Sequence, residues 1–216
     1  TPTRYYMRAE ANSSSPTAVS HYGFMLEIEN QHDGAQAHDA AEIAGSARVI
    51  APVLGGRTTY TGTIGGQDTD DWYRISAVSG QIISVSVAMT DYGPNPGTMY
   101  AYLYDAANAG SYKQYTTHSN PDTEAQILSY VSNSTAPAAY LIRFQRTSTS
   151  KGPARYSFTV ASSQQHDANV SGDAGDDFNS ARVITPTLDA ANNLLGSDDN
   201  SDFYLIDLPI SQDNGA

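Results

Sequence analysis

The chain of 216 residues contains no cysteine and only two lysines, Lys113 and Lys151. Without cysteine there is no disulfide framework and no thiolate that could bind a metal or act as a nucleophile. The 11 basic residues stand against 23 acidic residues, which gives a net charge of −12. Because nucleic-acid binding needs clustered basic side chains that neutralise phosphates, we expect no nucleic acid among the partners.

Long apolar runs and catalytic signatures are also missing. No stretch approaches the run of about 18 apolar residues that a membrane helix requires, so we expect no membrane span. The sequence has no His-Glu-x-x-His or Gly-x-Ser-x-Gly motif and no glycine-rich phosphate loop. The His-Asp pairs at 32–33 and 166–167 are better explained by local hydrogen bonding than as two copies of a catalytic base. We therefore predict that the protein is not an enzyme.

What the sequence does contain is an internal repeat. Residues 31–52 recur as residues 165–186 at a constant offset of 134, with 11 identities in 22 positions. Residues 68–75 return as residues 199–206 after the loss of three residues from the intervening loop. A repeat of this kind is the signature of a tandem array.

The N-terminal residues match the other end of the same unit. Tyr5-Tyr6-Met7-Arg8 corresponds to residues 140–143, and His21-Tyr22-Gly23-Phe24 corresponds to residues 155–158. We therefore predict three units: the C-terminal strands of a partial unit over residues 1–30, a complete unit over 31–164, and the N-terminal half of a further unit over 165–216.

The central unit shows short runs of alternating apolar residues separated by turn residues, which is typical of strands. Turns are indicated by segments such as Gly93-Pro94-Asn95-Pro96-Gly97, whose residues favour chain reversal. The fold class predicted is all-β, an antiparallel and jelly-roll-like β-sandwich. The strands are expected at residues 59–64, 71–77, 81–88, 98–104, 125–131, 138–145 and 154–161.

The central unit resembles the bacterial pre-peptidase C-terminal domain family. The resemblance rests on the acidic segment 33–47, on Thr61-Gly62-Thr63-Ile64, and on the segments Asp68-Thr69-Asp70-Asp71-Trp72-Tyr73 and Ser79-Gly80-Gln81-Ile82-Ile83. It implies a β-sandwich of the kind found beside secreted peptidases and in surface proteins. The unit is longer than the common form of that family, so the loops at residues 92–97 and 112–124 are expected to be insertions.

Two acidic groups occur in both copies of the repeat. The first group is Asp33, Asp39 and Glu42, which correspond to Asp167, Asp173 and Asp176 in the second copy. The second group is Asp68 and Asp71, which correspond to Asp199 and Asp202. Several carboxylates from two loops are what Ca²⁺ requires, and the resemblance implies Ca²⁺ near the start of the domain. The alternative is structural: Asp39 with Glu42 forms a capping box for a short helix over residues 40–46, and Asp68 and Asp71 form turns.

Aromatic residues and sequons suggest further sites. Trp72 has Phe203 as its counterpart, which is typical of a core position. Tyr100, Tyr102 and Tyr104 alternate with Met99, Ala101 and Leu103, so one of these two sets stays available on the surface, and a binding patch would also include Tyr112 and Tyr115. Acceptor sequons for N-linked sugar begin at Asn12, Asn133 and Asn169, so we include glycosylation among the expectations.

Two functional hypotheses follow for an extracellular or cell-surface protein. The first is a filament or surface-layer subunit, in which copies of the chain assemble head-to-tail because the N-terminal strands of one copy complete the C-terminal half-unit of the next. The alternative is a calcium-dependent, substrate-binding array of a secreted peptidase or adhesin that holds an extracellular polymer. The assembly residues of the first hypothesis are Tyr5, Met7, Tyr22, Phe24, Leu26 and Ile28.

Overall fold

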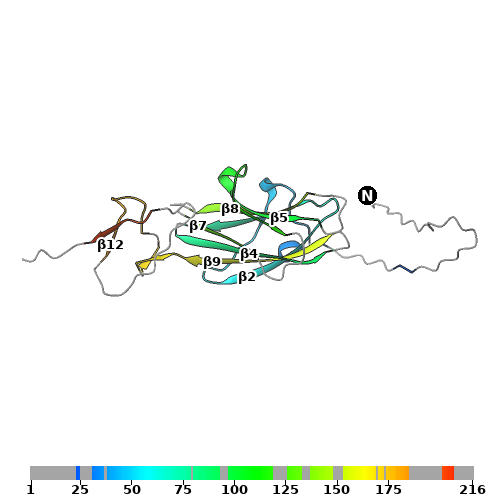
Figure 1. Ribbon diagram of the computed structural model, residues 1–216, viewed down its shortest axis with the longest axis horizontal. Coiled ribbons are helices and arrows are strands. Elements are labelled where there is room, and N and C mark those ends of the chain that lie inside the picture. Colours follow the sequence, from blue (N-terminus) through cyan, green and yellow to red (C-terminus); the bar gives the residue numbers. More distant parts are fainter. Residues whose placement is uncertain are drawn as a thin grey trace, which may run out of the picture.

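Figure 1 shows the computed structural model of the chain. It describes residues 23–24, 31–36, 38–78, 80–92, 97–118, 126–132, 137–147, 153–168, 170–172, 174–184 and 201–206. The three sequons at Asn12, Asn133 and Asn169 lie outside the described residues, so glycosylation remains a prediction. Of the predicted assembly residues only Phe24 is described, and its side chain is 67% exposed; Tyr5, Met7, Tyr22, Leu26 and Ile28 lie outside.

The central unit is a sandwich of two sheets that face each other (Figure 1). The four-stranded sheet has the order β2-β9-β4-β7, with bounds Arg57–Ile64, Ala154–Gln164, Gln81–Tyr92 and Gln126–Ser132. The five-stranded sheet has the order β1-β3-β8-β5-β6, with bounds Arg48–Val49, Asp70–Ala77, Ala138–Arg146, Met99–Asp105 and Tyr112–His118. Apart from β1, which pairs with β3 in parallel, the pairs of both sheets are antiparallel. The predicted all-β sandwich is therefore confirmed.

The alternation of side chains along each strand places the core between the sheets. On β5 the buried set is Met99, Ala101 and Leu103, each fully shielded from solvent, so the tyrosines of this strand point outward. Aromatic rings from both sheets meet in the centre: Phe144 lies 4.3 Å from Tyr156 and Tyr73 lies 4.8 Å from Phe158, measured between ring centroids.

In the central unit all seven predicted strands agree with the structure, and two further strands, β1 and β6, were missed. The interpretation of residues 112–124 as a loop insertion is wrong for β6, which pairs with β5 along its length. Its sequence, Tyr-Lys-Gln-Tyr-Thr-Thr-His, carries few aliphatic residues, and the weak alternation of Gln114, Thr116 and His118 was its only local signal. The two-residue strand β1 was also missed, because it exists only through its pairing with β3.

The second copy of the repeat contributes four short strands, β10 His166–Asp167, β11 Val170–Ser171, β12 Arg182–Ile184 and β13 Tyr204–Ile206. β12 lies beyond the sandwich in Figure 1. It pairs with β13 in parallel, with Arg182 opposite Tyr204, just as Arg48 lies opposite Tyr73 in β1 and β3. The described part of the chain contains no α-helix, only three short 3₁₀ turns, and none of these could cross a membrane.

Candidate metal centre and aromatic face

The N-terminal loop of the central unit folds over the ends of β2 and β3 and buries Asp33, whereas Asp39 and Glu42 of the same loop stay exposed. Asp33 is fully buried because its carboxylate accepts the backbone N–H of Thr63 at 2.8 Å and of Ala40 at 3.2 Å. Arg48 fixes the loop from outside by donating to the backbone carbonyls of Asp33 and Asp39. Both bonds go to backbone carbonyls, so Arg48 uses them to hold the shape of the loop and not to pair with the carboxylates of Asp33 and Asp39.

The second acidic group meets the first. Asp68 lies in the turn that connects β2 and β3, where Gly65 N–H donates to its carbonyl at 2.8 Å. Asp71 points inward from β3 and is fully buried. The five predicted acids of this unit form two overlapping clusters, Asp33-Asp39-Asp71 and Asp39-Glu42-Asp68, in each of which the possible ligand oxygens lie within 4.8 Å of one another.

Asp71 is held by a chain of buried hydroxyls. Tyr156 donates to one carboxylate oxygen at 2.6 Å, and the Tyr73 and Tyr156 hydroxyls lie 2.9 Å apart. Gly62 makes room for this arrangement, because a Cβ at that position would lie 2.3 Å from the Tyr156 ring. The other oxygen of Asp71 is buried and has no hydrogen-bond donor, and the same holds for one oxygen of Asp68.

Burial raises the pKa values of these acids, and the charges of the neighbouring acids raise them further. Burial, followed by the charge of Asp33, raises the pKa of Asp39 to about 6. Burial raises the pKa of Asp68 to about 8 even though the Gln31 amide donates to it at 2.6 Å. Burial and the charge of Asp68 raise the pKa of Asp71 to about 9. A bound divalent cation would reverse this, because it stabilises the charged carboxylates that ligate it.

The alternative of helix capping is wrong for this loop. No helix forms over residues 40–46; a 3₁₀ turn over Ala44–Ser46 follows Ile43 and has no side-chain cap. Asp68 does lie in a turn, as that alternative expected, but Asp71 lies within β3. The geometry therefore favours convergence of the acids at a metal site over local capping.

The second copy holds part of the same arrangement. Asp167 is fully buried and accepts the backbone N–H of Ala174 at 3.2 Å, as Asp33 accepts that of Ala40. Asp202 accepts the Tyr204 hydroxyl at 3.2 Å, whereas Asp176 is exposed. Asp173 and Asp199 lie outside the described residues, so a complete metal site in this copy remains a prediction.

The outer face of the five-stranded sheet carries a row of aromatic side chains. Pairing places Trp72 opposite Arg143, Arg143 opposite Tyr102, and Tyr102 opposite Tyr115. Tyr102 is central: its ring centroid lies 5.5 Å from Tyr112 and 6.0 Å from Tyr115. We call this surface the aromatic face; its members are Trp72, Tyr100, Tyr102, Tyr104, Tyr112, Tyr115 and Arg143.

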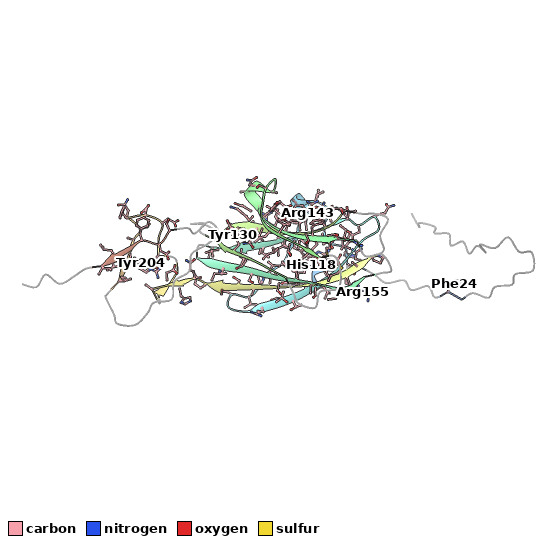
Figure 2. All side chains as sticks on the ribbon, in the orientation of Figure 1. Phe24, His118, Tyr130, Arg143, Arg155 and Tyr204 are labelled. Atoms are coloured by element: carbon pink, nitrogen blue, oxygen red, sulfur yellow. The ribbon has the colours of Figure 1, made fainter. Side chains whose placement is uncertain are left out.

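Arg143 organises the aromatic face. It lies on the side of β8 that faces away from the other sheet (Figure 2), with its guanidinium 5.0 Å from the Trp72 ring and 5.8 Å from the Tyr102 ring. Asp70 binds it at 2.6 Å. Sequence reasoning missed both residues, because their roles depend on the register between β3 and β8. Trp72 is buried as predicted, but it packs on this outer face with Tyr104 and Leu141 rather than in the sandwich core.

Comparisons with known proteins give structural similarity only. No protein-family model matches the chain, and no curated protein matches it. Among solved structures, the pre-peptidase C-terminal domain of a Bacillus anthracis collagenase is similar at 17% identity and a TM-score of 0.37, covering 53% of this chain and 92% of that one.

Two other structures are similar at comparable levels. The Yersinia pseudotuberculosis-derived mitogen has 19% identity and a TM-score of 0.32, covering 49% of this chain and 84% of that one. The Aeromonas hydrophila periplasmic inhibitor of g-type lysozyme has 13% identity and a TM-score of 0.29, covering 53% and 97%. We therefore base the function on the chain's own residues.

Proposed function

We propose that the chain is a non-catalytic, extracellular accessory module of a secreted peptidase or adhesin. In this proposal it binds an extracellular polymer through the aromatic face and holds Ca²⁺ in the acidic centre, which is our name for the two overlapping clusters of Asp33, Asp39, Glu42, Asp68 and Asp71. The observation that carries the proposal is the row of tyrosines on the outer side of β5 and β6. A sandwich needs no such residues on its solvent side, and contiguous exposed aromatic surface marks interaction sites.

The exposed part of the aromatic face has the properties of a binding surface. Tyr112 and Tyr115 are 49% and 53% exposed, while Tyr104 is buried and its ring centroid lies 6.4 Å from that of Tyr112. Tyrosine offers a large apolar ring with a polar tip and loses little conformational entropy on binding. The buried members hold the exposed ones in place, so the surface is arranged before a polymer binds.

The acidic centre supports the calcium part of the proposal. Ca²⁺ takes six to eight oxygen ligands, and the carboxylates of Asp33, Asp39, Glu42, Asp68 and Asp71 come from the N-terminal loop, from the turn between β2 and β3, and from β3 itself. One oxygen each of Asp68 and Asp71 is buried without a hydrogen-bond donor, and a bound cation would satisfy both. An ion here would tie the N-terminal loop to the turn between β2 and β3, so its role would be structural.

The N-terminal loop of the central unit, which carries Asp33, Asp39 and Glu42, also adjoins the aromatic face. The backbone N–H of Trp72 donates to the carbonyl of Ala41 at 3.0 Å, one residue before Glu42. Ala44 and Ala47 of the same loop pack against the cluster of Trp72, Tyr104 and Leu141. A cation that fixes this loop would therefore also stabilise the border of the aromatic face at Trp72.

Co-sedimentation with insoluble fibrous proteins and insoluble glycans tests the proposal. The double variant Tyr112→Ala, Tyr115→Ala should lose at least about tenfold in affinity, equivalent to about 1.4 kcal/mol, with an unchanged melting temperature. The matched control is Thr59→Ala, Thr159→Ala, on the outer face of the opposite sheet, where the two hydroxyls lie 2.8 Å apart. Equal binding by both double variants would exclude the aromatic face as the binding surface.

A further inference from the structure

A polar pocket lies on the four-stranded sheet, away from the aromatic face. Its volume is about 360 Å³, which is within the range of small-ligand sites. Figure 2 shows Arg155, which lines the pocket, on the opposite side of the sandwich from Arg143 of the aromatic face. The described residues that line it are His32, Thr61, Gly62, Thr63, Thr90, Arg155 and Tyr156.

The register of β2 and β9 places two threonines and an arginine together on the outer side of the sheet. Gly62 is buried between Thr61 and Thr63, so both threonines point outward. Arg155 lies opposite Thr63, and directly opposed residues of antiparallel strands project from the same face. Arg155 is itself exposed, so its guanidinium belongs to the outer wall of the pocket.

A bulge in β4 brings the third threonine to the pocket. Met89 pairs with Tyr156 and Asp91 pairs with Arg155, so Thr90 is left outside the regular pairing of β4 with β9. Bulges re-aim the side chain of the extra residue and increase the local twist of the strand. This irregularity hollows the outer side of a sheet that would otherwise be smooth at this point.

The N-terminal loop supplies His32 to the pocket and is fastened to its wall. The backbone N–H of Thr63 donates to the carboxylate of Asp33 at 2.8 Å, and its carbonyl accepts the Gln31 amide at 2.7 Å. His32 precedes the 3₁₀ turn Asp33–Ala35, but its side chain makes no capping hydrogen bond there. The imidazole is therefore held beside the pocket without being used to stabilise the turn.

The chemistry of the lining favours an acidic and hydroxylated ligand. A guanidinium binds a planar carboxylate through two parallel hydrogen bonds, and an imidazole adds a further donor. Threonine hydroxyls both donate and accept, as the hydroxyls of a sugar ring do. None of the described lining residues is acidic. The net charge of −12 opposes an anion, but charges more than about 8 Å away are largely screened at physiological salt.

We propose that this pocket binds a uronic acid residue of an acidic glycan. Arg155 pairs with the carboxylate, His32 donates to the same group, and Thr61, Thr63 and Thr90 bind ring hydroxyls. The inference goes beyond the proposed function, because it assigns a different ligand to the opposite sheet. It stands whether or not the aromatic face binds a polymer.

Titration of the intact chain with sodium glucuronate tests the proposal, followed by the backbone amide signals in nuclear magnetic resonance spectra. Chelator is present, so that Ca²⁺ cannot bridge the acid to the protein. We expect a Kd of about 1–10 mM, with the largest shifts at Thr63, Thr90 and Arg155. Glucose, which has the ring without the acid, and glutamate, which has the acid without the ring, should each bind at least about tenfold more weakly.

Arg155→Gln should weaken glucuronate binding at least about tenfold and leave the melting temperature unchanged. Arg57→Gln is the matched control, because Arg57 is an exposed arginine of the same sheet that lines a smaller hollow of about 130 Å³. It should bind glucuronate as the unmodified chain does. Equal losses in both variants would reduce the effect to general charge and overturn the proposal.

Three further results would overturn the assignment of the ligand. The first is an intact chain that shows no binding of glucuronate. The second is glucose that binds as tightly as glucuronate, because the acid would then not be recognised. The third is glutamate that binds as tightly, because the pocket would then fit an acidic peptide as well as a sugar.

Discussion

The two copies of the repeat are alike where contacts are local and differ where partners come from far along the chain. Asp33 and Asp167 are both fully buried, and each accepts the backbone N–H of the alanine seven residues later. Asp71 and Asp202 differ. Asp71 binds the hydroxyl of Tyr156, 85 residues away, whereas Asp202 binds that of Tyr204, two residues away.

This difference separates the contacts that form within the N-terminal loop from the contacts that the strands of the sandwich add. The loop holds the first aspartate of each copy through the N–H of its alanine, and in the first copy the N–H of Thr63 on β2 adds a second donor. The strands β8 and β9 pack around β3, on which Ile75 and Tyr73 are buried. Substitutions at equivalent positions of the two copies should therefore have unequal effects, and each position of the second copy is a control for its counterpart in the first.

The largest difference is expected between Trp72→Ala and Phe203→Ala. Trp72 is 7% exposed and packs against Tyr104 and Leu141, so its removal should lower the free energy of unfolding by about 3–5 kcal/mol. Phe203 is only partly buried and contacts Phe178, which is 85% exposed, so its removal should cost about 1 kcal/mol or less. Denaturant unfolding measures both values, and equal costs would mean that Trp72 is not held more tightly than Phe203.

Calcium removal should have the next largest effect. At a free Ca²⁺ concentration of about 100 times the Kd, binding to the folded form alone adds about 2.7 kcal/mol, so a chelator should lower the melting temperature by several degrees at neutral pH. Asp39→Ala should abolish this sensitivity, because Asp39 belongs to both acidic clusters.

Asp176→Ala is the control for Asp39→Ala, because Asp176 is exposed as Asp39 is but belongs to neither acidic cluster of the described residues. It should keep most of the response to chelator. An intact chain whose melting temperature is the same with Ca²⁺ and with chelator would show that the centre binds no calcium under those conditions.

A further effect is expected from pH in the absence of metal. The folded-state pKa values of Asp39, Asp68 and Asp71 are about 6, 8 and 9, all above the value of about 3.9 expected in the unfolded chain. The folded state therefore binds more protons between these limits, and stability falls as pH rises. The contribution is fully present below about pH 4 and is lost as pH rises through about 6 to 9.

Melting temperatures measured in chelator from pH 5 to pH 9 check this dependence. Asp71→Asn should remove the loss that remains above pH 8, because the amide does not ionise. Asp177→Asn is the matched control: Asp177 accepts hydrogen bonds from Asn179 and Ser180, which lower its pKa, so its substitution should leave the profile between pH 5 and pH 9 unchanged. A metal-free chain that gains stability over that range would contradict the raised pKa values.

The sequence determined the fold class and most of the strands of the central unit, because period-two alternation and turn residues report directly which side chains are buried. It also indicated the acids of the candidate metal centre, since the internal repeat marks them twice. That Tyr112 and Tyr115 join the tyrosines of β5 was anticipated as a candidate patch, although the strand that carries them was not.

Tertiary structure decided everything that depends on register. Which face of β5 is buried, why Asp71 is buried beside Tyr156, and why Arg143 lies between Trp72 and Tyr102 all follow from pairing between strands that are far apart in sequence. The sequence alone contains no local signal for such pairing, because a strand has the same pattern whichever neighbour it joins. The individual strands can therefore be predicted from the sequence, whereas the two candidate sites form only when distant strands pair and the two sheets pack together.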